Sequence, residues 1–182
     1  MRRKPAEIRS NEAGADGALS QGSRPVNILI AGIPTPPLLE MIQARYPGRL
    51  DLYVAECRPY EMQVARGIAA IPSRSIRVSV VTDNMMAALI ETVPIRAVWS
   101  QYLEINDEHA VAINGAHMAA LLAKSFGIPC LLYPISGLPE GESGRFAGED
   151  ITVPGSAYIA WEPDIVPLEL VREVIEHGPL HP

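Results

Sequence analysis

The stretch IRVSVVTDNMMAALIE, residues 76–91, joins a run of β-branched residues directly to a run with helical spacing. Its first part, residues 76–82, has the length and the Val-rich composition of a strand. We expect a helix over residues 83–91, with Asp83 as its N-cap, because an aspartate side chain can accept hydrogen bonds from the first backbone N–H groups of a helix. The stretch therefore predicts one β-α unit.

The same alternation of strand and helix continues in both directions from this unit. We expect further strands at residues 26–32, 50–56, 95–100, 128–134 and 156–161, and further helices at 36–46, 59–71, 109–127 and 167–178. The strands are short and continuously apolar, as in parallel sheets that are covered on both faces. The sequence predicts a doubly wound, mostly parallel, Rossmann-like α/β sheet with helices on both faces.

The length and composition fit one globular domain with a flexible arm in front of it. The chain has 182 residues, of which 48% are hydrophobic and 20% are charged. Residues 1–25 are rich in Gly, Ser, Ala and charge, so we expect a disordered arm there and the Rossmann-like domain over residues 26–182.

Charge and cysteine content narrow the classes of partner and compartment. The chain carries a net charge of −6, and residues 26–182 carry 10 basic and 18 acidic groups, which disfavours nucleic acid as a partner. No apolar run reaches the roughly 18 residues of a membrane span, and no apolar segment follows the basic residues 2–4, so we expect no membrane association and no secretory signal. Two cysteines, Cys57 and Cys130, form neither a disulfide framework nor a zinc set. We therefore expect a cytoplasmic protein.

A site in such a sheet is expected beyond the carboxyl ends of the strands. No GxGxxG follows the first strand and no GxxxxGK[ST] is present, so a dinucleotide or P-loop nucleotide has little support. We expect no cofactor and no metal ion. The predicted strand ends are Gly32–Thr35, Glu56–Arg58, Thr82–Asn84, Ser100–Leu103 and Tyr133–Gly137.

Four segments together resemble one known family in their order and spacing. They are ECRPYEMQVAR (56–66), IRVSVVTDNMMAALI (76–90), AKSFGIPCLLYP (123–134) and EPDIVPLELVREVI (162–175). They are similar to the carboxyl-terminal domain of the family that contains methylthioribose-1-phosphate isomerase, ribose-1,5-bisphosphate isomerase and the regulatory subunits of translation initiation factor 2B. The resemblance covers about residues 26–178. It implies a Rossmann-like domain that usually dimerises, with a phosphorylated pentose at the strand ends.

The resemblance also implies that the isomerase chemistry is lost in this chain. The isomerases of the family use a cysteine after the first strand of this domain and an aspartate in a GADRI motif. The cysteine position falls near Gly32, and the aspartate position falls on Leu103. The Asn-Lys pair that binds substrate in the isomerases falls on Ala112 and Ile113. Leucine cannot transfer a proton, and general acid-base groups typically contribute about 10²–10⁴-fold.

Among the candidate ligand-binding residues, Arg58, Asp83 and Asn84 fall on family positions that are kept in this chain. A family glutamine falls on Met62, or on Gln63 if one residue has slipped. From the resemblance we expect only the 25-residue arm in the place of the family's amino-terminal helical domain, which covers the substrate. We expect ligand contacts from Gly32, Arg58, Gln63, Asp83, Asn84 and Gln101, and any new catalytic chemistry from Glu56, Asp83, Glu104 or His109.

Most of these candidates also have a structural interpretation. Glu56 and Arg58 suit a strand-end ion pair as well as anion binding. Residues 100–115, SQYLEINDEHAVAING, suit a solvated strand-to-helix loop as well as a new catalytic or metal site. On the expected helix at 109–127, His109 and His117 would share one face, although metal ligands on a helix usually stand four residues apart.

Three functional hypotheses remain open. The first, which we favour, is a non-isomerase relative that acts as a ligand-binding or assembly module with a regulatory role. The second is a diverged isomerase-like enzyme acting on a phosphorylated sugar or a similar small anion. The third is a subunit completed by a partner protein chain. We also expect a homodimer formed through the helix that begins at Asp83, because that helix is apolar on more than one face.

Overall fold

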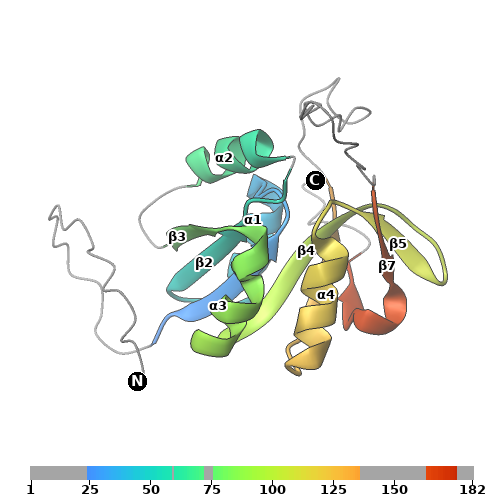
Figure 1. Cartoon of the computed structure of the whole chain (residues 1–182). Coiled ribbons are helices and arrows are strands. Elements are labelled where there is room, and N and C mark those ends of the chain that lie inside the picture. The colour runs from blue at the N-terminus through green and yellow to red at the C-terminus, as the bar shows by residue number, and fades with distance from the viewer. Residues whose placement is uncertain (1–23, 59, 72–75, 136–162, 176–182) are drawn as a thin grey trace, which may run out of the picture.

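A computed structural model describes residues 24–58, 60–71, 76–135 and 163–175. These residues form one eight-stranded sheet with the order β3-β2-β1-β4-β5-β7, in which β6 pairs with β4 and β8 pairs with β6 (Figure 1). The strands are β1 (Val26–Ala31), β2 (Leu50–Ala55), β3 (Ile76–Val81), β4 (Ile95–Ile105), β5 (His109–Ala112), β6 (Cys130–Pro134), β7 (Asp164–Pro167) and β8 (Glu173–Val174). The helices are α1 (Pro36–Arg45), α2 (Glu61–Ala69), α3 (Met86–Thr92) and α4 (Ala116–Ser125), with 3₁₀ turns η1 (Asp83–Met85) and η2 (Leu168–Leu170).

The parallel core of the sheet confirms the predicted fold class. β1 pairs in parallel with β2 and with β4, β2 pairs with β3, and β4 pairs with β6. The central strand β1 is fully buried from Ile28 to Ala31, as expected where helices cover both faces of a parallel sheet. The carboxyl ends of these strands meet at one edge, and that edge is where a ligand site is expected.

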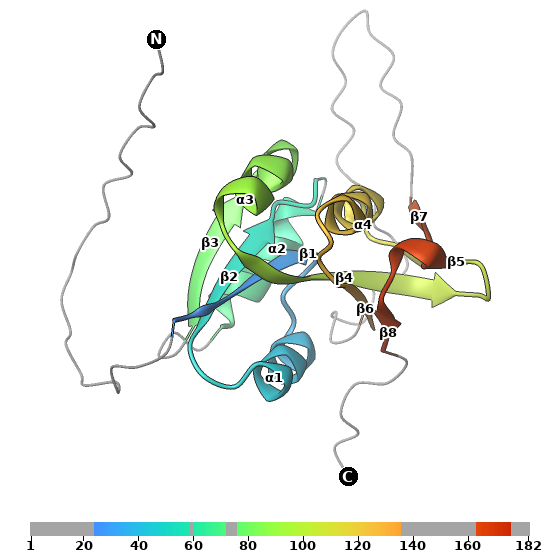
Figure 2. The ribbon, with the colours of Figure 1, turned by 90° about the horizontal axis from the view of Figure 1, so that it is seen from below.

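The helices lie on both faces of the sheet, as predicted. Figure 2 shows α1 on one face and α3 with α4 on the other, where α3 and α4 are in contact. Helix α2 lies toward the carboxyl ends of the strands, and a Cβ atom added to Gly67 would come within 2.9 Å of the Pro34 carbonyl oxygen. This close approach seats α2 against the loop that follows β1.

The segment 100–115 is a β-hairpin, so the expected loop and the expected helix from residue 109 are wrong. Strand β4 runs on to Ile105, and β5 returns antiparallel to it. The Asn106 side chain makes the turn, because its Oδ1 accepts hydrogen bonds from the backbone N–H groups of Glu108 and His109, both at 2.9 Å. Helix α4 begins only at Ala116. His109 is therefore in a strand and shares no helix face with His117.

The hairpin brings residues 113–115 to the carboxyl end of β1. Tyr102 of β4 pairs with Ala112 of β5 and also with Pro134 of β6. A strand has only two edges, so β5 and β6 lie on opposite edges of β4, and β5 continues along the edge that β1 occupies earlier. The Ile113 N–H donates to the Gln101 carbonyl at 3.2 Å. The turn into α4 therefore starts beside the loop after β1.

The last described segment replaces the expected helix at 167–178 with two short strands. Strand β7 pairs with β5, and β8 pairs with β6. Between them, η2 crosses and buries Leu170. We call residues 164–174 the strap. Its apolar spacing suits a helix, but the open edges of β5 and β6 leave backbone groups that only an extended segment can pair.

Several expectations lie outside the described residues. They are most of the arm at 1–25, the strand at 156–161 and the end of the last expected helix. None of the helices in the described ranges is long and apolar enough to cross a membrane.

Candidate functional site

The Asp83 carboxylate joins the carboxyl ends of β2 and β3. Its Oδ1 accepts a hydrogen bond from the Cys57 backbone N–H at 2.8 Å, and its Oδ2 accepts one from Arg58 N–H at 3.0 Å. Asp83 is therefore not the expected helix N-cap. Thr82 stands at the cap position of η1 without a side-chain cap bond, and its hydroxyl contacts Asn84 Oδ1 at 2.7 Å. The carboxylate holds the loop after β2 in place.

The residue held by this clamp, Cys57, has an uncommon backbone conformation. Its φ angle is 52°, in the left-handed region, where non-glycine residues are strained. Its side chain is only 1% exposed. Burial, and then the nearby Asp83 charge, raise the pKa of the Cys57 thiol, while a hydrogen bond from the Gly32 backbone acts in the opposite direction. A buried thiol with a raised pKa holds little of the thiolate that nucleophilic chemistry requires.

Glu56 and Arg58 form an ion pair at the same strand end. Arg58 Nε donates to Glu56 Oε2 at 3.1 Å, and this hydrogen bond is the main reason that the Arg58 pKa is raised. The Arg58 side chain is 66% exposed, so the pair contributes little to stability. Because Glu56 and Asp83 lie beside it, Arg58 does not give this part of the strand ends a positive net charge.

Gln101 lies across the end of β1. Its side chain is fully buried, and its Oε1 accepts a hydrogen bond from the Ile33 backbone N–H at 2.6 Å. A Cβ atom added to Gly32 would come within 2.8 Å of this oxygen. Glycine at position 32 and glutamine at position 101 are therefore matched to each other.

Gly32→Ala should lower the free energy of unfolding by about 1–3 kcal/mol, because the new methyl group forces the Gln101 side chain from its place. In the double variant Gly32→Ala/Gln101→Ala the methyl group meets no such obstacle. The two substitutions should then cost less together than the sum of the single variants, which a double-mutant cycle in urea measures. Simple additivity would show that the two side chains do not compete.

Unpartnered polar atoms gather around the carboxyl ends of the parallel strands. Five buried side-chain atoms in the described ranges have no hydrogen-bond partner: Thr35 Oγ1, Gln63 Oε1, Trp99 Nε1, Gln101 Nε2 and Asn114 Oδ1. Thr35 follows β1, Gln63 is in the first turn of α2, Gln101 is in β4 beside the end of β1, and Asn114 precedes α4. Buried polar groups without partners are costly unless water or a ligand satisfies them. These four amide and hydroxyl groups fit a polar ligand or bound water.

Asp164, in the strap, contributes a further carboxylate near the carboxyl ends of the parallel strands. Its Oδ2 accepts a hydrogen bond from the His117 backbone N–H at 3.0 Å, in the first turn of α4. The residue at the cap position, Gly115, has a φ of 89° and no side chain to do this. Neither Asp164 nor Thr35 was among the sequence candidates, because their roles depend on pairings between distant segments.

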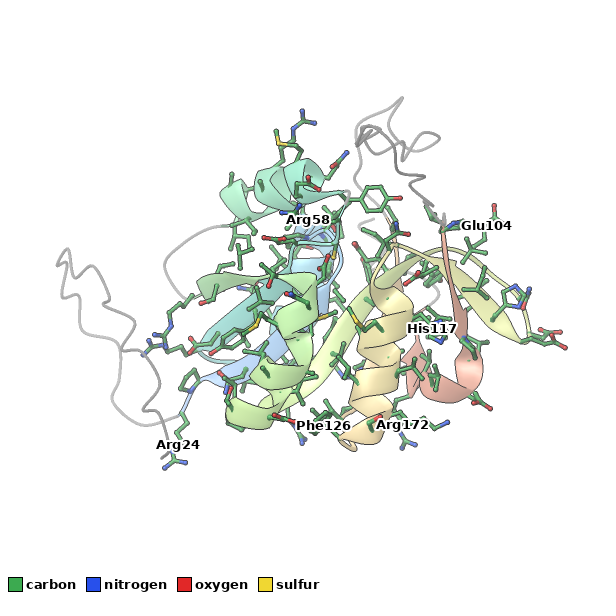
Figure 3. All side chains as sticks on the ribbon, viewed as in Figure 1. Arg24, Arg58, Glu104, His117, Phe126 and Arg172 are labelled. Atoms are coloured by element: carbon green, nitrogen blue, oxygen red, sulfur yellow. The ribbon has the colours of Figure 1, made fainter. Side chains whose placement is uncertain are left out.

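Two of the four catalytic candidates lie elsewhere. Glu104 is exposed on the outer part of β4, and His109 is half-buried at the start of β5, with its Nε2 at 3.1 Å from Asn106 Nδ2. Figure 3 shows Glu104 well separated from Arg58. The sites of Gly32, Glu56, Arg58, Asp83 and Gln101 are at the carboxyl edge, and Asn84 is exposed beside them. In the described part of the chain, no group of three His, Cys, Asp or Glu side chains could hold a metal ion.

These features define a Rossmann-like α/β domain with a polar, partly unsatisfied edge at its strand ends. A family model described as the initiation factor 2 subunit family matches residues 23–133. The match covers more than half of the 182 residues, and the chain belongs to this family.

Solved structures agree with this assignment in fold. Subunit delta of translation initiation factor eIF-2B from A. fulgidus matches with a TM-score of 0.61 and 16% identity, over 84% of this chain and 52% of that one. The 5-methylthioribose 1-phosphate isomerase from Pyrococcus horikoshii matches with a TM-score of 0.58 and 20% identity, over 83% of this chain and 50% of that one. At these identities the likeness concerns the fold alone. The chain spans about half the length of both proteins.

One solved structure is a tetrameric eIF2B-beta2-delta2 complex from C. thermophilum, which matches with a TM-score of 0.48 and 15% identity, over 84% of this chain and 49% of that one. That assembly belongs to that complex and carries no argument for the assembly of this chain.

Proposed function

We propose that this chain is a non-isomerase member of its family and acts as a ligand-binding, regulatory module. The observation that carries the proposal is the Gln101 side chain beside Gly32. Its Oε1 is engaged by the Ile33 N–H, while its Nε2 is a buried donor without a partner. A small polar ligand that accepts a hydrogen bond from Nε2 would satisfy this group, because a buried donor left unpaired is costly.

The side chains at the carboxyl ends of the strands support ligand binding more than catalysis. The thiol nearest to Gly32 in the loops after β1 and β2 is that of Cys57, and its burial and raised pKa disfavour proton transfer. Leu103, at the position that the family resemblance gives to a catalytic aspartate, has no titratable group. The Asp83 carboxylate is held by two backbone N–H groups. These observations favour the module over a diverged enzyme.

The purified chain should show no isomerase activity toward methylthioribose 1-phosphate or ribose 1,5-bisphosphate. The reason is that the Cys57 thiol is buried with a raised pKa, the Asp83 carboxylate is held by two backbone N–H groups, and Leu103 has no titratable group. A coupled assay at micromolar enzyme is the measurement, with an active isomerase as positive control. Turnover near one per second, an ordinary enzyme rate, would refute the proposal.

Ligand binding is tested separately with the native protein. Native mass spectrometry of the freshly purified chain should reveal a co-purified small molecule, and its occupancy should fall in Gln101→Leu, which removes Nε2 at similar volume. Gln43→Leu is the matched control, because it makes the same change at an exposed glutamine on α1 that is not among the candidate ligand contacts. Equal occupancy in all three proteins would place the ligand elsewhere.

Self-association belongs to the same proposal. Met85 is 52% exposed at the start of the α3 region, while Ala88 and Leu89 are only partly covered. Together these neighbouring side chains offer an apolar surface that a second copy of the chain could cover, and a C₂ pair would bring the same helix of both subunits together.

A further inference from the structure

A hollow lies at the opposite end of the sheet from the candidate site. It has a volume of about 450 Å³ and is lined by Arg45, Tyr46, Arg96, Leu131, Arg172 and Glu173. These residues come from the end of α1, the amino ends of β4 and β6, and the strap. Figure 3 shows Arg172 at the lower end of the molecule and Arg58 at the upper end. The two regions are therefore separate.

The hollow concentrates positive charge in an acidic chain. Three arginines and one glutamate line it, whereas the whole chain carries a net charge of −6. Arg45 is engaged by Glu173 through two hydrogen bonds, at 2.8 and 2.6 Å. Arg96 and Arg172 are exposed and form no ion pair with another described residue. Two guanidinium groups are thus available at the rim, and the lining has two more positive than negative groups.

A break in the sheet register supplies one of these arginines. In the pairing of β1 with β4, Asn27 stands opposite Ile95 and Ile28 stands opposite Ala97. Arg96 is left without a partner, as the extra residue of a bulge. Bulges redirect a side chain and are frequent beside binding sites. The bulge is an observation independent of the hollow, and it involves a residue that lines the hollow.

We propose that this hollow is an anion site that binds the phosphate group of a small phosphorylated molecule. Guanidinium groups pair with phosphate oxygens through two parallel hydrogen bonds. A phosphate monoester carries nearly two negative charges at pH 7, which matches the charge of the lining. The volume is within the range of small-molecule pockets, roughly 300–1,000 Å³, so it has room for an organic group as well. The site does not depend on the function proposed above.

Calorimetric titration of the full chain with inorganic phosphate and with pyrophosphate tests the site. Both should bind, and Arg96→Gln and Arg172→Gln should each weaken binding by about tenfold or more, the usual size of a charged hydrogen bond. Arg49→Gln is the matched control, because Arg49 is exposed near the same end of the sheet but does not line the hollow. Arg58→Gln reports on the carboxyl edge. Neither control should change the dissociation constant.

Each other outcome overturns the proposal. Absence of binding to the unmodified chain does so, as does unchanged affinity in Arg96→Gln and Arg172→Gln. Equal weakening in Arg49→Gln would reveal a diffuse charge effect, and loss in Arg58→Gln alone would assign the anion to the carboxyl edge. Arg172 lies outside the strands, so its variant keeps the test valid if Arg96→Gln disturbs folding. Titration with a sugar phosphate then distinguishes free phosphate from a phosphate ester: tighter binding of the ester shows that the organic group is recognised.

Discussion

Met86→Glu should destabilise the protein strongly, with a loss of about 4 kcal/mol or more in the free energy of unfolding. Met86 is 0% exposed and belongs to the core of its own chain. The substitution removes that packing and places a carboxylate in the buried apolar core, which is among the most costly changes known. Urea unfolding followed by circular dichroism measures the effect. A loss below about 1 kcal/mol would show that Met86 is accessible in solution.

The adjacent variant Met85→Glu separates core packing from self-association. Met85 is 52% exposed, so the substitution should change the stability of a single chain by less than about 0.5 kcal/mol. If α3 forms the dimer interface, sedimentation should show a dimer for the unmodified chain and a monomer for Met85→Glu. A clean 19.7 kDa monomer of the unmodified chain at micromolar concentration would end the dimer proposal. Met86, which lies on the helix that we expected to form the dimer, is buried in the core of its own chain and cannot belong to the interface.

Asp83→Ala should lower the free energy of unfolding by about 3 kcal/mol. The variant loses both carboxylate hydrogen bonds to the backbone N–H groups of Cys57 and Arg58. Hydrogen bonds to a charged group are worth about 1.5–3 kcal/mol each, and partial access of water to the site offsets some of the loss. The left-handed backbone of Cys57, with φ at 52°, also loses the group that holds it.

Thiol accessibility gives this prediction a local readout. Cys57 is 1% exposed, so a disulfide reagent should modify it slowly in the unmodified protein and at least tenfold faster in Asp83→Ala, since about 1.4 kcal/mol of local destabilisation is a tenfold change in opening. Asn84→Ala is the control, because the Asn84 side chain is exposed and its one hydrogen bond within the described residues is to Thr82. Identical rates in all three proteins would show that Asp83 does not hold the loop.

The parallel part of the fold could be predicted because each of its elements carries its own signal. Residues 26–31 are continuously apolar and are buried as β1, and the strand-to-helix switch at Asp83 is where η1 begins. The carboxyl edge followed from the same pattern, since the ends of parallel strands must meet. The hydrogen-bond partners of Asp83 could not be predicted, because an aspartate at this position suits either the N-cap of the following helix or a bond to the loop after the neighbouring strand β2.

The hairpin and the strap could not be predicted from local pattern. Residues 109–112 alternate between half-buried and buried, but two of them are alanines, which favour helices, and the ten-residue helix α4 begins only four positions later, at Ala116. Residues 167–175 have the apolar spacing of a helix, with Leu168, Val171 and Ile175 on one side. Pairing with β4 and β7 decides the first segment, and pairing with β5 and β6, which are distant in sequence, decides the strap. The unpartnered amides of Gln101 and Asn114 could not be predicted either, because their burial also depends on pairing between distant segments.

The strap has a consequence for the order in which the protein forms during translation. Strands β5 and β6 are both complete by residue 134, yet their outer partners are residues 164–167 and 173–174. About 30 residues must still leave the ribosome before either pairing can close. At about 5–20 residues per second this delay lasts several seconds. For that time the nascent domain holds two open strand edges, the kind of surface that pairs with other chains, so the strap is the segment whose late arrival makes chaperone protection most useful.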